Sequence, residues 1–98
     1  MNYIPPLKQA AARVVHVVRL CESALENEQT LRLQGVPPEN VRYAKEMLTD
    51  MADQYTKDAL PPREHRHAQL SRLIIDQWPL GNELGNAIIA AENEWLHY

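Results

Sequence analysis

Residues 5–25 of the chain, PPLKQAAARVVHVVRLCESAL, decide its fold. Apolar residues recur in this stretch at alternating spacings of four and three, which is the spacing of one face of an α-helix. They are Leu7, Ala11, Val14, Val18, Cys21 and Leu25. A second apolar row runs beside them, made of Ala10, Val17, Ala24 and Leu31. At ~100° per residue the two rows cover about half of the helix circumference. We therefore expect one helix over residues 7–33, placed in the centre of a bundle or shared between two subunits.

Proline pairs divide the rest of the chain. They are Pro5-Pro6, Pro37-Pro38 and Pro61-Pro62, and a helical pattern follows each pair. Proline lacks a backbone N–H and has a fixed φ, so it fits the first turn of a helix and disrupts the interior. The break at Pro79 and Gly81 separates two further segments. The sequence thus predicts helices over residues 7–33, 38–60, 63–78 and 82–96.

The fold class follows from this pattern. The alternation of apolar and polar residues that is typical of a strand does not occur. Four helices with short connections favour an antiparallel arrangement. A chain of 98 residues is one domain by size. We predict an all-α protein, a small antiparallel bundle of about four helices, with a single helical domain over residues 1–98.

The net charge of −3 is mild, but the charges are unevenly distributed. Residues 1–20 hold three bases and no acid, whereas residues 76–98 hold four acids and neither Lys nor Arg. A dedicated phosphate-binding surface usually makes a domain basic, so nucleic acid is an unfavoured partner. No stretch has the pattern of a signal peptide or a membrane span, and the lone Cys21 cannot form an internal disulfide. These features predict a cytoplasmic protein that does not bind a membrane.

No catalytic, cofactor-binding or metal-binding site is expected, and the chain is not predicted to be an enzyme. His65 and His67 are two residues apart and would point to different faces of a helix, which does not suit a shared metal. Cys21 lies within the apolar row of the first helix, where a buried, unreactive thiol is expected. With three glycines in the chain, none in a phosphate-binding arrangement, no nucleotide loop is predicted.

One segment is basic enough to form a contact surface. Arg63, Arg66 and Arg72 fall within the third predicted helix. A DNA-recognition helix can have this composition. Against this role, the bases spread around the helix and no aromatic side chain is interleaved with them. A nucleic-acid-associated regulator that uses this helix is therefore the alternative hypothesis.

The last predicted helix has two apolar rows. Its inward row is Leu84, Ala87, Ile88, Ala91 and Trp95, and a second row holds Gly85, Ile89 and Leu96. Together with Trp95 and Tyr98, the second row forms a patch of the kind that marks contact with a partner. The same row would also result if a small bundle covered this helix on two sides. Both interpretations stay open at this point, and the predicted protein interface is Ile89, Trp95, Leu96 and Tyr98.

The sequence therefore favours a small helical protein–protein interaction module. Such a protein acts as an adaptor, a regulatory modulator or an inhibitor of a larger protein, which the sequence does not identify. Accessory factors made by phages or bacteria fit this description. A homodimer is a second kind of assembly that the wide apolar arc of the first helix would suit.

Overall fold

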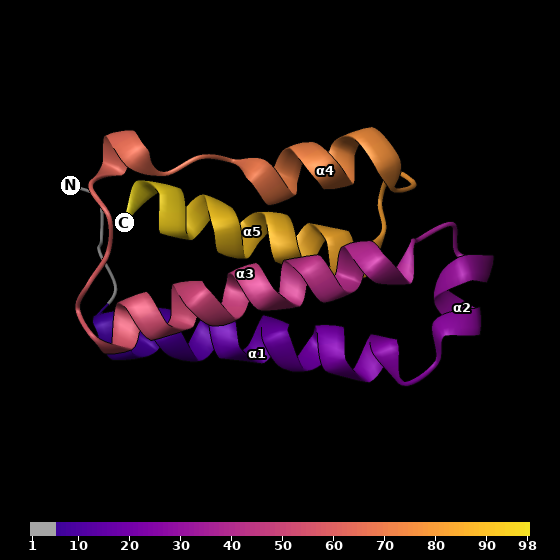
Figure 1. Ribbon diagram of the computed structural model, residues 1–98, viewed down its shortest axis with the longest axis horizontal. Helices are drawn as coiled ribbons and strands as arrows, with labels where there is room; N and C mark the ends of the chain where they lie inside the picture. The colour runs from indigo at the N-terminus through magenta and orange to yellow at the C-terminus, as the bar shows by residue number, and fades with distance from the viewer. Residues whose placement is uncertain (1–5) are drawn as a thin grey trace.

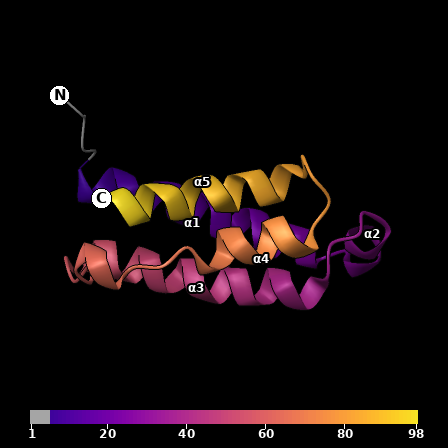
Figure 2. The same cartoon turned by 90° about the horizontal axis from the view of Figure 1, so that it is seen from above.

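The computed structural model describes residues 6–98 as a bundle of helices, with no strand in that range. Its elements are α1 (Leu7–Leu25), α2 (Glu28–Leu33), α3 (Pro38–Thr56), the 3₁₀ turn η1 (Arg63–His65), α4 (Gln69–Gln77) and α5 (Glu83–His97). The long helices α1 and α3 run antiparallel, and α4 and α5 form a second layer over them (Figures 1 and 2). The predicted all-α antiparallel bundle is confirmed. Residues 1–5, including Pro5 of the first proline pair, lie outside the described residues.

The centre of the core lies between α1 and α3. The buried residues of α1 are Ala10, Ala11, Val14, Val17 and Cys21. Those of α3 are Pro38, Val41, Ala44, Leu48, Met51, Ala52 and Tyr55. The buried face of α1 therefore lies between its two predicted apolar rows and takes residues from both. The core is largely aliphatic, and α5 adds Ile88, Ala91 and Trp95 to it.

The prediction of one helix over residues 7–33 is wrong, because the helix ends at Leu25 and a new one begins at Glu28. Asn27 has φ −135° and ψ 80°, outside the helical region. Its side-chain Oδ1 accepts a hydrogen bond from the Thr30 amide at 3.1 Å, so it caps α2. Asparagine competes with the helix in this way because its side chain can replace a backbone acceptor. Gly35, with φ +77°, then ends α2 in the left-handed conformation that suits glycine.

Helix α3 ends at Thr56, four residues before the predicted end at Leu60. Asp58 adopts φ +50°, the left-handed conformation that terminates many helices. The Ala59 amide donates to the carbonyl oxygen of Gln54 at 2.8 Å, and this bond closes the last turn. Helix α3 therefore ends before the chain reaches the proline pair at 61–62.

The third predicted helix begins six residues late, at Gln69 and not at Arg63. Residues 63–65 form η1 and residues 66–68 are not helical. The first turn of α4 is capped from another helix: the Glu92 carboxylate of α5 accepts from the amides of Leu70 and Ser71, both at 2.8 Å. It also accepts from the Ser71 hydroxyl at 2.6 Å. A carboxylate is favourable at a helix N-terminus, where amides lack partners.

The predicted start of the last helix is confirmed. Asn82 precedes the first turn of α5, and its Oδ1 accepts from the Gly85 amide at 2.9 Å. The prediction of a helix start from the local sequence is therefore correct at Asn82. At α4 the start is set instead by a side chain that lies more than twenty residues away in the chain.

Replacing Glu92 by Ala is expected to lower the free energy of unfolding by about 2–4 kcal/mol, because the buried amides of the first turn of α4 lose their acceptor. Glu92 is 0% exposed, whereas Glu46 is exposed on α3. Glu46→Ala is the control and should change stability by about 0.5 kcal/mol or less. Urea unfolding followed by circular dichroism measures both. Equal stabilities of the two variants would contradict the role assigned to Glu92.

Candidate functional site

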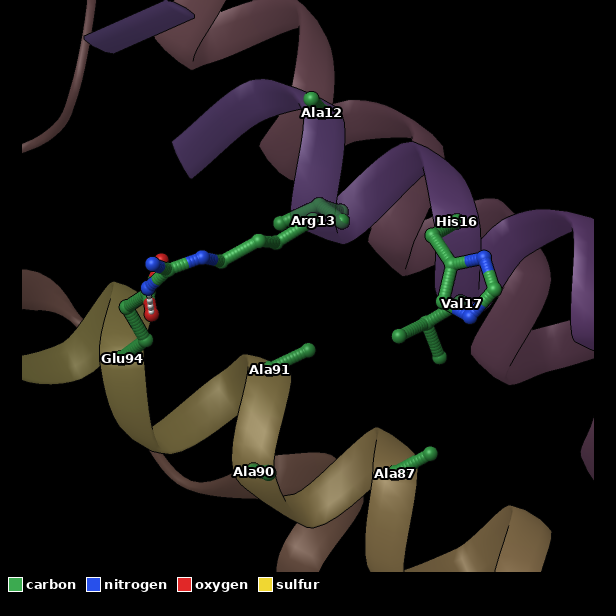
Figure 3. Close-up of a pocket in the computed structure, with 9 residues that line it drawn as sticks. Ala12, Arg13, His16, Val17, Ala87, Ala90, Ala91 and Glu94 are labelled. Atoms are coloured by element: carbon green, nitrogen blue, oxygen red, sulfur yellow. Dashed lines mark hydrogen bonds and ion pairs between the residues drawn. The ribbon is translucent and has the colours of Figure 1, made fainter. Parts of the chain in front are cut away.

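A groove of about 460 Å³ lies between α1 and α5. Its lining is mostly alanine and valine, with Arg13, His16 and Glu94 as the polar members. Figure 3 shows Ala12 and Val17 on α1 and Ala87, Ala90 and Ala91 on α5. An alanine side chain extends one carbon from the backbone, so facing alanines do not fill the space between two helices. The groove exists because the sequence places small residues where these two helices face each other.

The side chains at the groove divide by charge. Arg13 and His16 line it from α1, and Glu94 lines it from α5. Glu83 falls on the same face of α5 at helical spacing from Ala87, Ala90 and Glu94. We call the α1 side, with Arg13, the basic wall and the α5 side, with Glu83 and Glu94, the acidic wall.

One ion pair spans the groove at its end. The Arg13 Nη1 lies 2.9 Å from the Glu94 Oε2, and Figure 3 shows the two side chains reaching toward each other. The Arg13 side chain is 60% exposed, so the pair itself adds little stability. Its guanidinium still has further N–H donors that face solvent. The pair thus leaves donors at one end of the groove that an incoming carboxylate can use.

The groove can bind an apolar surface, and it holds no arrangement that suggests catalysis. His16 is the one histidine among the lining residues, and no Ser or Cys lines the groove. Within residues 6–98, no group of three or more His, Cys, Asp or Glu side chains could hold a metal ion. No helix in the described range is long and apolar enough to cross a membrane.

Of the four predicted interface residues, Trp95 lies in the core of the single chain. The Trp95 side chain is buried, and its Nε1 donates to the Gln54 Oε1 of α3 at 2.8 Å. This hydrogen bond joins the layer of α5 to that of α3. A partner contact at Trp95 stays a prediction.

The other three predicted interface residues, Ile89, Leu96 and Tyr98, are half-buried and pack against the core. The Tyr98 and Tyr55 rings pack edge to face, with 5.2 Å between their centroids. On the same side of α5, Gly85 lies so close to α4 that an added Cβ would meet the Ile74 side chain at 3.0 Å. The chain itself therefore covers much of the second apolar row. A partner contact at Ile89, Leu96 and Tyr98 stays a prediction.

Two of the three arginines of the predicted basic surface bind the end of α5. The Arg66 Nη1 donates to the Trp95 carbonyl oxygen at 2.7 Å, and its Nε donates to that of Pro61 at 2.8 Å. Arg63 donates to the Tyr98 carbonyl oxygen at 3.0 Å. Positive charge is favourable at a helix C-terminus, where carbonyl groups lack partners. Arg72 is exposed on α4, and a contact surface made of the three arginines stays a prediction.

Cys21 is buried, as predicted, and belongs to the α1–α3 core. Burial raises the pKa of its thiol to about 11, while the nearby positive charge of Lys45 opposes this shift. The thiol is therefore protonated at neutral pH. A protonated, buried thiol is a poor nucleophile.

Comparisons of the chain with family models and with curated proteins find no match. The α1/α5 groove is therefore distinguished by its own geometry. Its lining is largely apolar, and Arg13 on α1 and Glu94 on α5 place opposite charges on its two sides. The sequence contained one signal for it, the separation of bases in residues 1–20 from acids in residues 76–98.

Cys21 is expected to react slowly with a thiol reagent in the folded protein. At pH 8 a thiol of pKa about 11 is ionised to ~0.1%, and the reagent must also reach a buried group. The measurement is the rate of colour release from a disulfide reagent, with the protein in guanidinium as the reference. The folded rate should be about 100-fold lower or more. Equal rates would show that the thiol is accessible.

Replacing Ile89 and Leu96 together by Ser should lower the free energy of unfolding by about 2–4 kcal/mol, because both side chains pack against the core. The matched control is Ile75→Ser with Leu80→Ser, at side chains that are 62% and 93% exposed. The control should change stability by about 0.5 kcal/mol or less. If the first pair left stability unchanged, those side chains would be free to contact a partner.

Proposed function

We propose that the protein is a helical interaction module, which binds an α-helical segment of a protein partner in the α1/α5 groove. The observation that carries the proposal is the groove itself, with its short apolar lining side chains. Amphipathic helices commonly bind by laying an apolar face into such a groove. Short side chains on the receiving helices let the backbone of the bound helix come close.

The dimensions of the groove suit a short helix. The lining residues of α5 run from Ala87 to Glu94, about two turns at 1.5 Å per residue. Leu20 follows Val17 by three residues on α1, so it lies on the same side of that helix. It is 37% exposed and extends the apolar surface beyond the lining residues. The bound segment would thus present about two to three turns of apolar side chains.

As a module of this kind, the protein would act as an adaptor, a modulator or an inhibitor of a larger protein. Occupying a helix of that protein would recruit it or mask its surface. The compartment that we propose is the cytoplasm, where the single thiol of Cys21 stays reduced. The positions of Arg63, Arg66 and Arg72 do not favour the nucleic-acid alternative, because two of them bind carbonyl groups of the same chain.

The test compares Ala90→Arg, which fills the groove, with Ala59→Arg, the same change at an exposed position after α3. Tagged proteins are used to capture partners from native lysate, which are identified by mass spectrometry. A captured partner is then purified and its affinity measured. We expect wild type and Ala59→Arg to bind it alike and Ala90→Arg to bind about 10-fold more weakly or worse, a loss of ~1.4 kcal/mol.

Circular dichroism should show the same helical content in all three proteins. Repeating the binding at higher salt separates the two kinds of partner, because phosphate contacts weaken steeply with salt and an apolar groove does not. A partner that binds wild type and Ala90→Arg equally would contradict docking in the groove.

A further inference from the structure

The two helices that form the groove carry charges of opposite sign. Helix α1 has Lys8, Arg13 and Arg19 and no acid before Glu22. Helix α5 has Glu83, Glu92 and Glu94 and neither Lys nor Arg. Glu92 is buried against α4, so the outer charge of α5 comes from Glu83 and Glu94. One face of the molecule therefore holds a basic wall and an acidic wall with an apolar groove between them.

Such a face is complementary to itself under one symmetry operation. A two-fold axis parallel to the groove places α1 of each copy on α5 of the other copy. A two-fold axis across the groove places α1 on α1 and α5 on α5. The first arrangement brings each basic wall onto an acidic wall, whereas the second brings like charges together. The distribution of charge thus selects the axis that runs along the groove.

We propose that, in the free protein, the occupant of the groove is a second copy of the same chain, related by a two-fold axis along the groove. This inference rests on the proposed function, because it requires the groove to be a docking surface. It goes further in naming the partner that covers the groove before any larger protein binds. A larger protein would then compete with the second copy.

The Arg13–Glu94 ion pair supports this arrangement. Rotation about an axis along the groove leaves the position of each residue along that axis unchanged. The ion pairs of the two copies therefore lie side by side. Arg13 contacts its own Glu94 through Nη1 at 2.9 Å, and its remaining N–H groups can donate to Glu94 of the second copy. The two copies together would form a cluster of two guanidinium groups and two carboxylates.

The side chains of the groove also suit close packing of four helices. Ala12 and Val17 of one copy would face Ala87 and Ala90 of the other. Side chains of this size allow interaxial distances of about 8–9 Å. The dimer would cover the apolar lining of both copies. Burial of apolar surface supplies its affinity, and the charged walls set its register.

The first experiment measures the oligomeric state by sedimentation velocity over about 1–200 μM, a range that detects dimers of micromolar affinity. We expect wild type and Ala59→Arg to form dimers with rising concentration. We expect Ala90→Arg to stay monomeric, because it adds bulk and places a positive charge opposite the basic wall of the second copy. A monomeric wild type at every concentration, or a dimer that Ala90→Arg retains, would overturn the proposal.

The second experiment exchanges charges between the walls. Arg13→Glu gives a chain with acids at positions 13 and 94, and Glu94→Arg gives a chain with bases at both positions. Each variant alone should dimerise about 10-fold more weakly than wild type or worse, a cost of ~1.4 kcal/mol. An equimolar mixture should form heterodimers about 10-fold more tightly than either variant self-associates. The repulsion within each chain is the same in the mixture, so this gain reports contacts between chains. A mixture that associates no better than its components would refute the two-fold axis along the groove.

The two proposals can fail separately. If wild type is monomeric and Ala90→Arg still loses its captured partner, the proposed dimer is overturned and the proposed function stands. If Ala90→Arg abolishes the dimer but captures the same proteins as wild type, the proposed dimer is supported. Docking of a larger partner in the groove is then overturned.

Discussion

The Glu92 carboxylate holds the second layer of the bundle together. It is buried on α5 and accepts three hydrogen bonds from the first turn of α4. Without this acceptor, α4 would begin with unpaired amides inside the protein, which is costly. Because α4 is a short helix of nine residues, its own turns give it little stability. Its position therefore depends on the contact with α5.

This attachment also explains why α5 leaves a groove on its other side. The side of α5 that faces α4 packs closely, as the Gly85 contacts with Ile74 and Trp78 show. Arg66 lies in the segment before α4, and its side chain donates a hydrogen bond to the Trp95 carbonyl oxygen near the C-terminal end of α5. The side that faces α1 instead presents alanines and one ion pair. Helix α5 is thus held by α4 and by the core, and a groove remains where it faces α1.

The sequence predicted the fold class well because proline and helical periodicity act locally. The helices after Pro38 and Asn82 begin where these signals place them. The wrong helix boundaries come from interactions that a periodic pattern of apolar residues does not reveal. The Asn27 cap interrupts a heptad pattern that would otherwise continue, and the start of α4 depends on Glu92, distant in the chain. The hydrogen bonds of Arg63 and Arg66 to carbonyl oxygens at the end of α5 also join residues that are distant in the chain.

The groove could not be predicted from the sequence because alanine is compatible with both core and surface. Ala87 and Ala91 were expected to face inward, and the pattern did not show that Ala12 and Ala90 would lie beside them across a gap. Charge was the more informative property. The bases of the first helix and the acids of the last do not predict a binding surface when each helix is considered alone. When the fold places the two helices as neighbours, the face that they share carries both positive and negative charges. A surface with both signs and small apolar side chains can be covered by a copy of itself without burying an unpaired charge.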